Sequence, residues 1–180
     1  MTEQDIRNLI LDDSEMMNVL KAVKDLRLPD CWIGAGFVRN KVWNYLHQYP
    51  NDLNSSDIDV VYYNDRNTDS EQEKAIENAL AQKISSDWSV TNQARMHTEN
   101  GDEQYTSTED AISYWPETAT AVAVRLGQSH ELEIIAPYGL DDLLSMIIRM
   151  SPKFKDPNKF KQRLSSKRWQ ERWPQVTIIN

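Results

Sequence analysis

Two aspartates, Asp57 and Asp59, stand two residues apart in a run of β-branched and aromatic residues. Such a run favours a β-strand, in which side chains alternate between faces, so we expect both carboxylates on one face. Neighbouring carboxylates repel each other unless a cation lies between them, and Mg²⁺ prefers hard oxygen ligands. The pair therefore predicts a site for Mg²⁺ or Mn²⁺, although one such pair is also expected by chance in an acidic chain.

The second candidate feature is the segment Gly34-Ala35-Gly36, which follows the short apolar run 31–33 and opens a helical pattern. Backbone N–H groups at a helix N-terminus can hold a triphosphate, and glycine allows close approach. The alternative is that both glycines only form a tight turn between a strand and a helix. Arg39 lies one turn into this helix, where it either contacts a phosphate or pairs with an acid such as Asp57.

A third carboxylate is expected on the strand 131–135, where we choose Glu133. Glu131 points to the same face and stays an alternative. Asp141 and Asp142 are better explained as acids in the first turn of a helix. Three carboxylates and two metal ions can align the attacking and leaving oxygens of an in-line phosphoryl transfer.

Other chemistries find less support. The segment at Gly34 begins a Gly-x-Gly-x-x-Gly pattern, but its third position is Arg39, which is too large for the close contact of a dinucleotide fold. The single cysteine, Cys31, lies among apolar residues and is interpreted as a buried reduced thiol. Arg95 and His97 are secondary candidates for contacts in a cleft, although a structural role is favoured for the histidine.

The element pattern predicts one mixed α/β domain over 1–180, with a β-sheet packed on helices. Strands are expected over 57–63, 88–91, 118–126 and 131–135, and helices over 70–84 and 140–150. A basic helix over about 156–173 ends the chain.

Charge is unevenly distributed along the 180 residues. The net charge is −8, but residues 151–180 hold eight Lys or Arg against two acids, which leaves the first 150 residues at −14. An acidic body repels a phosphate backbone, so long nucleic acid is an unlikely partner. Apolar stretches are too short to span a bilayer and the N-terminus is acidic, so no membrane association and a cytoplasmic location are expected.

The order of elements in this chain resembles that of the nucleotidyltransferase superfamily, which includes DNA polymerase β. A strand ends in a glycine pair, a helix follows, and an Asp-x-Asp strand and a later acidic strand come after it. Residues 33–40 are similar to a segment of the CCA-adding enzymes, with Ala35 and Asn40 as departures. The chain is more similar to a bacterial family of nucleotidyltransferase-like proteins. That resemblance rests on residues 34–40, 57–60, 92–97, 115–120 and 136–143.

This resemblance implies a nucleotidyltransferase fold and the transfer of a nucleoside monophosphate from an NTP to a small-molecule or protein acceptor. It assigns the metal and catalytic roles to Asp57, Asp59 and Glu133. Gly34, Ala35, Gly36 and Arg39 would bind the nucleotide. The chain has no room for the helical domains that hold tRNA in CCA-adding enzymes. The alternative is a nucleotide- or protein-binding module that keeps the fold without catalysis.

Overall fold

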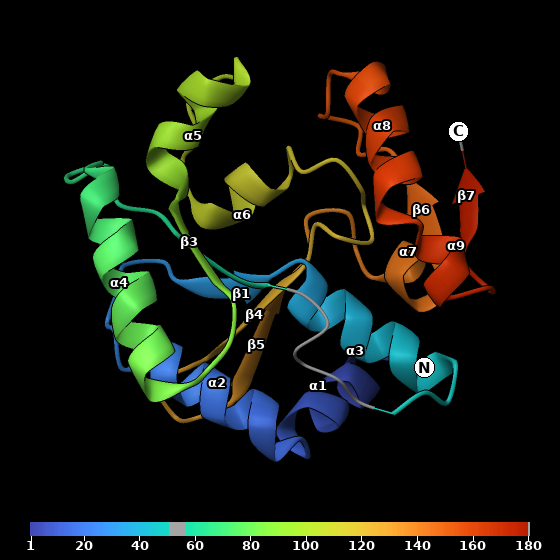
Figure 1. Cartoon of the computed structure of the whole chain (residues 1–180), viewed down its shortest axis with the longest axis horizontal. Coiled ribbons are helices and arrows are strands. Elements are labelled where there is room, and N and C mark those ends of the chain that lie inside the picture. The colour runs from blue at the N-terminus through green and yellow to red at the C-terminus, as the bar shows by residue number, and fades with distance from the viewer. Residues whose placement is uncertain (51–56, 180) are drawn as a thin grey trace.

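The protein is described by a computed structural model that covers residues 1–50 and 57–179 (Figure 1). Within these ranges, five strands form a mixed sheet in the order β3-β2-β1-β4-β5. Strand β1 pairs antiparallel with β2 and β4, β4 pairs antiparallel with β5, and β2 pairs parallel with β3. The strands are β1 (Trp32–Gly34), β2 (Ile58–Tyr62), β3 (Trp88–Asn92), β4 (Ala123–Leu126) and β5 (Leu132–Ile135).

Helices pack on one face of this sheet. Here α2 contacts β4, α3 contacts β1 and β2, and α4 contacts β3, while α1 packs on α2 and α3. Figure 1 shows α5 and α8 on opposite sides of the upper half of the molecule. The helices are α1 (Glu3–Leu11), α2 (Ser14–Lys24), α3 (Gly36–Leu46), α4 (Ser70–Lys83), α5 (Gln93–Asn100), α6 (Thr108–Ile112), α7 (Asp141–Leu144), α8 (Pro157–Lys167) and α9 (Trp169–Arg172).

The expected alternation along β2 is confirmed. Ile58, Val60 and Tyr62 belong to the main core beneath the helices. Val61, which lies on the opposite face, packs in a smaller cluster with Trp32. Because side chains alternate with period two, Asp59 shares the face of Val61 and points away from the main core. Ile112 of α6 belongs to this smaller cluster, so this face of the sheet is partly covered by apolar residues and also carries the polar side chain of Asp59.

The C-terminal part differs from the helical prediction. Only Asp141–Leu144 is helical in the segment predicted as one helix over 140–150, and β6 (Ile147–Arg149) follows it and pairs parallel with β7 (Thr177–Ile179). A short apolar run does not distinguish a strand from a buried helix, which explains the error. The basic helix also divides, because Arg168 takes a left-handed conformation between α8 and α9.

The strand predicted over 118–126 is shorter than expected, since β4 comprises only Ala123–Leu126. Residues 118–122 are buried, and within this stretch Thr120 accepts a hydrogen bond from Arg39. Among the described residues, no helix has both the length and the apolar composition that crossing a membrane requires.

Candidate active site

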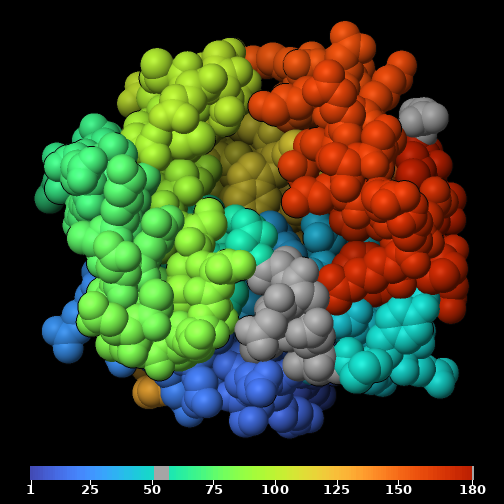
Figure 2. Space-filling model, viewed as in Figure 1, coloured from blue at the N-terminus to red at the C-terminus, as the bar shows by residue number. Residues whose placement is uncertain are grey.

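The two aspartates lie at the start of β2. Asp59 stands opposite Gly34 on β1 and opposite Ser89 on β3. Asp57 directly precedes the strand and is exposed. Figure 2 shows a hollow between the α5 side and the α8 side of the molecule, with teal atoms from the start of β2 on its floor. The register therefore places Asp59 beside the glycine turn.

The Asp59 carboxyl is in an unusual electrostatic environment. Burial and, to a lesser extent, the negative charge of Asp57 raise its pKa to about 6, whereas a hydrogen bond from Ser89 and the charges of Arg39 and Lys167 oppose this rise. A carboxylate that is desolvated beside a second carboxylate is stabilised by a cation. The two carboxylates and the Ser89 hydroxyl offer hard oxygen ligands, so these residues fit a divalent cation.

The glycine turn is only partly free to bind a phosphate. The N–H of Ala35 donates to the carbonyl of Val122 over 3.1 Å, so it does not take the phosphate contact predicted for it. Helix α3 begins at Gly36, and the first N–H groups of a helix have no acceptor within the helix. The positive end of α3 therefore stays suited to an anion from Gly36 onwards.

Ala35 itself has a strained backbone. Its φ of 53° and ψ of −120° lie in a region that residues with a Cβ rarely adopt. The turn is fixed by the bond to Val122 and by the N–H of Arg39, which donates to the Ala35 carbonyl. Strain of this kind occurs where surrounding contacts hold a functional turn in place.

Arg39 is buried and already bonded. Its guanidinium donates to Thr120 over 2.7 Å and to the side chain of Asn40 over 2.9 Å. It lies 5.5 and 5.4 Å from the ring centroids of Trp43 and Trp169. Burial lowers its pKa to about 10. Its Nε is buried without a hydrogen-bond partner among the residues that the structure describes. The contact between Arg39 and a nucleotide stays a prediction.

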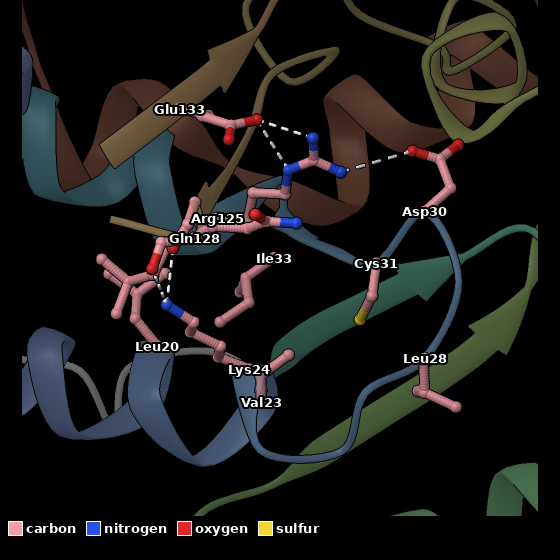
Figure 3. A pocket seen from close by; sticks show the side chains of 12 residues that line it. Leu20, Val23, Lys24, Leu28, Asp30, Cys31, Ile33, Arg125, Gln128 and Glu133 are labelled. Atoms are coloured by element: carbon pink, nitrogen blue, oxygen red, sulfur yellow. Dashed lines mark hydrogen bonds and ion pairs between the residues drawn. The ribbon is translucent and has the colours of Figure 1, made fainter. Parts of the chain in front are cut away.

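Glu133 does not lie with the aspartates. On β5 it faces Arg125 of β4, whose guanidinium forms a 2.6 Å ion pair with it (Figure 3). Three strand spacings separate β5 from β2, or about 14 Å along the sheet. A Cβ added to Gly127 would meet the carboxylates of both Glu131 and Glu133. Both candidates for the third carboxylate thus lie at the β4–β5 turn, and the expected three-carboxylate site is not supported.

The described residues supply no replacement for this third carboxylate. Within 1–50 and 57–179, no three His, Cys, Asp or Glu side chains gather closely enough to hold a metal ion. Asp142 is engaged by Arg149 over 2.9 Å and by Thr118 over 2.6 Å. The candidate metal site therefore consists of Asp57 and Asp59.

The secondary candidates have structural partners. Arg95 forms ion pairs with Glu73 over 2.6 Å and with Glu99. His97 contacts the carbonyl of Ala94 through Nδ1 over 3.0 Å. The structural role favoured for the histidine agrees with this contact. Cys31 is partly buried, and burial raises the pKa of its thiol to about 12, in agreement with an inert thiol.

Two residues that the sequence analysis did not select complete the cleft. Arg163 of α8 forms an ion pair with the fully buried Glu117 over 2.6 Å. Lys167, one helical turn further on, contributes its positive charge to the environment of Asp59. Residues four apart share a helix face, and this spacing within the basic segment was the available signal. Of these two cations of α8, Lys167 acts on Asp59, whereas Arg163 is paired with Glu117.

Comparison with known proteins agrees with this geometry. The model of a family described as "Nucleotidyltransferase" matches residues 21–178. A structure described as "The NMR structure of the protein reveals a CCA-adding enzyme head domain" matches with a TM-score of 0.89 and 34% identity, covering 99% of this chain and 96% of that one. No curated protein matches the chain.

Larger enzymes share the fold at lower identity. A CCA-adding enzyme in complex with CTP matches with a TM-score of 0.62 and 15% identity, over 97% of this chain and 43% of that one. The Thermotoga maritima CCA-adding enzyme complexed with tRNA matches with a TM-score of 0.58 and 16% identity, over 97% of this chain and 42% of that one. The chain thus spans less than half the length of these two enzymes, and the likeness to them shows the fold alone.

Proposed function

Since the chain belongs to this nucleotidyltransferase family, we propose that it transfers a nucleoside monophosphate from an NTP to a small acceptor, with Asp57 and Asp59 holding Mg²⁺ or Mn²⁺. The observation that carries the proposal is the position of Asp59. It lies opposite Gly34, beside the strained turn into α3, and teal atoms of the β2 region lie on the floor of the hollow in Figure 2.

The groups of the chain have separate roles in this reaction. Asp57 and Asp59 would hold the cation, which when bound neutralises negative charge on the phosphates. The N-terminus of α3 at Gly36 attracts the phosphate chain, because its unbonded N–H groups and the helix dipole favour anions. Lys167 adds positive charge to the environment of Asp59. Ser89 holds the Asp59 carboxylate through a hydrogen bond.

The proposed reaction is a phosphoryl transfer at the α-phosphorus of the NTP. The acceptor oxygen forms a bond to the α-phosphorus, the bond from that phosphorus to pyrophosphate breaks, and the acceptor proton passes to water. The protein contributes mainly by positioning and by electrostatic stabilisation, which are the dominant effects in phosphoryl transfer. Arg39 contributes by fixing α3 against α9, as its contacts with Trp43 and Trp169 indicate.

A second candidate function is supported by the position of Glu133. Because this carboxylate pairs with Arg125 and lies away from the aspartates, we also consider a module that binds a nucleotide and transfers nothing. Fold similarity does not decide between the two, since one fold serves several activities. Release of pyrophosphate from a bound NTP in the presence of an acceptor separates them.

Isothermal titration with ATP, GTP, CTP and UTP tests the nucleotide site. We expect at least one NTP to bind in the presence of Mg²⁺ or Mn²⁺, and binding to be lost in Asp57→Asn/Asp59→Asn. The matched control is Asp65→Asn/Asp141→Asn, which removes the same charge at two exposed positions and is expected to bind like the wild type. Absence of binding by all four NTPs would overturn the proposal.

A further inference from the structure

A cavity of about 280 Å³ lies beside the N-terminal half of α8. Its walls come from separate parts of the chain: the end of α5, the segment after α6, the loop before α8, and α8 itself. The lining residues used below are Asp102, Tyr114, Trp115, Phe154, Asp156 and Lys159. The hollow in Figure 2 extends over olive atoms of the segment around α6, between the α5 and α8 sides.

Trp115 lines this cavity and also lies close to Gly34 of β1. A Cβ added to Gly34 would lie 2.8 Å from the edge of the Trp115 ring, so this ring covers Gly34. Gly34 is the direct cross-strand partner of Asp59. Residues opposite each other on antiparallel strands lie about 5 Å apart. A molecule in the cavity would therefore lie within reach of a nucleotide bound at Asp59.

Most of the charges around the cavity are already paired. Lys153 pairs with Asp110 over 3.0 Å, Lys155 with Asp102 over 3.3 Å, and Arg163 with Glu117 over 2.6 Å. Asp156 on the wall is occupied as the N-cap of α8, where it accepts two backbone hydrogen bonds. The side chain of Lys159 has no ion-pair partner among the residues that the structure describes. Its charge is thus the one that a ligand can neutralise.

Part of the remaining lining is aromatic or apolar. Trp115 and Phe154 form part of the walls, and Lys153 covers Tyr114, with its Nζ 4.6 Å from the ring centroid. Pockets for small ligands combine such apolar walls with a few polar groups. The volume suits a molecule of nucleotide size or smaller and not a polynucleotide. A ligand with one anionic group and a flat apolar part matches this lining.

We propose that this cavity binds the acceptor, and that the acceptor is a small phosphorylated molecule whose phosphate contacts Lys159. The inference rests on the proposed function, because the cavity would hold the molecule that accepts the nucleoside monophosphate. Binding in the cavity itself requires only the lining residues. It is therefore expected to be independent of Mg²⁺ and of the aspartates.

The test is isothermal titration with AMP, CMP, GMP, UMP and ribose 5-phosphate in EDTA. We expect at least one probe to bind the wild type and Asp57→Asn/Asp59→Asn equally, and to bind about tenfold more weakly to Lys159→Gln, since a charge-assisted hydrogen bond is lost. Lys161→Gln is the matched control, because Lys161 is exposed on the same helix and does not line the cavity. It is expected to bind normally.

The outcomes of the two proposals are separable. If a probe binds through Lys159 but no NTP binds with metal, the proposed function fails and the cavity remains a phosphate site. The opposite result is that an NTP binds at the aspartates but every probe binds Lys159→Gln as tightly as it binds Lys161→Gln. That result overturns the acceptor inference. An equal loss of probe affinity in Lys159→Gln and Lys161→Gln also overturns the inference, because the loss would then reflect the net charge of the protein and not a contact in the cavity.

Discussion

Arg163 on α8 holds the fully buried carboxylate of Glu117 through two hydrogen bonds, with its Nε 2.6 Å from Oε1 and its second nitrogen 3.1 Å from Oε2. Two-point contacts of this kind fix geometry as well as charge. They join the C-terminal basic helix to the segment that carries Trp115. The wall of the cleft is therefore held by an ion pair between residues that lie far apart in the sequence.

We predict that Arg163→Met destabilises the protein by about 2 to 4 kcal/mol, because it leaves the Glu117 carboxylate buried and unpaired. Denaturant unfolding measures this change. The control is Arg168→Met, which removes an exposed ion pair with Glu171 and is expected to cost less than about 1 kcal/mol. Equal losses in the two variants would show that the buried pair does not hold α8.

A second prediction concerns the Asp59 carboxyl in metal-free protein. Because its pKa in the folded state, about 6, is above the ordinary value of 3.8, the ionised form is disfavoured by folding. Asp59→Asn should therefore stabilise the protein in EDTA at pH 7.5, by about 1 to 2 kcal/mol after allowance for partial exposure. The same change should abolish metal binding.

The sign of the pH dependence follows from linkage. The penalty on wild-type Asp59 is fully present above pH 6, decreases as the pH falls through the folded pKa, and vanishes below the unfolded value of about 4. The stability difference between Asp59→Asn and the wild type should therefore decrease as the pH falls from 7.5 to 4. Thermal unfolding at several pH values measures it, and a difference that grows toward acid pH would contradict the assignment.

A third prediction uses the strain at Ala35. Glycine adopts its φ of 53° and ψ of −120° without a Cβ clash. Ala35→Gly should relieve about 1 to 3 kcal/mol of backbone strain in the folded protein. The greater conformational freedom of glycine in the unfolded chain should lower the free energy of unfolding by up to about 1 kcal/mol. A net stabilisation of about 1 kcal/mol is expected in denaturant unfolding. Ala79→Gly, at an exposed position in the interior of α4, is the control and should instead destabilise.

A fourth prediction concerns the contact between Gly34 and Trp115. Gly34→Ala places a methyl group 2.8 Å from the Trp115 ring and 3.2 Å from the carbonyl of Val122. We expect lower stability and weaker NTP binding, because the ring must move at the edge of the site. Trp115→Leu should partly restore both properties in the double variant. If the double variant shows no recovery, the contact with the Val122 backbone and not the ring is responsible.

The elements around Asp59 could be predicted from the sequence because their signals are local. Alternation with period two predicted that Asp57 and Asp59 share a face, and the structure places Ile58 and Val60 in the core on the opposite face. The glycine pair marked the turn from β1 into α3. These features depend on a few consecutive residues, and the fold class and the family could be inferred from them.

Features that depend on strand order could not be predicted in the same way. Glu133 has the right residue type and face, but only the order β3-β2-β1-β4-β5 shows that β5 lies three strand spacings from β2. Glu117 and Arg163 are distant in the sequence, and nothing local marks them as partners. Strand β6 is three residues long, too short to show a period.

The central claim is that the divalent cation and the nucleotide bind at Asp57 and Asp59, and paramagnetic broadening of backbone amide signals by Mn²⁺ in the presence of ATP tests it most directly. We predict selective broadening of the amides of Gly36 and Asp59, and its loss in Asp57→Asn/Asp59→Asn. Broadening centred on Glu131 and Glu133, at the β4–β5 turn, would contradict the account and place the metal on the other acidic strand.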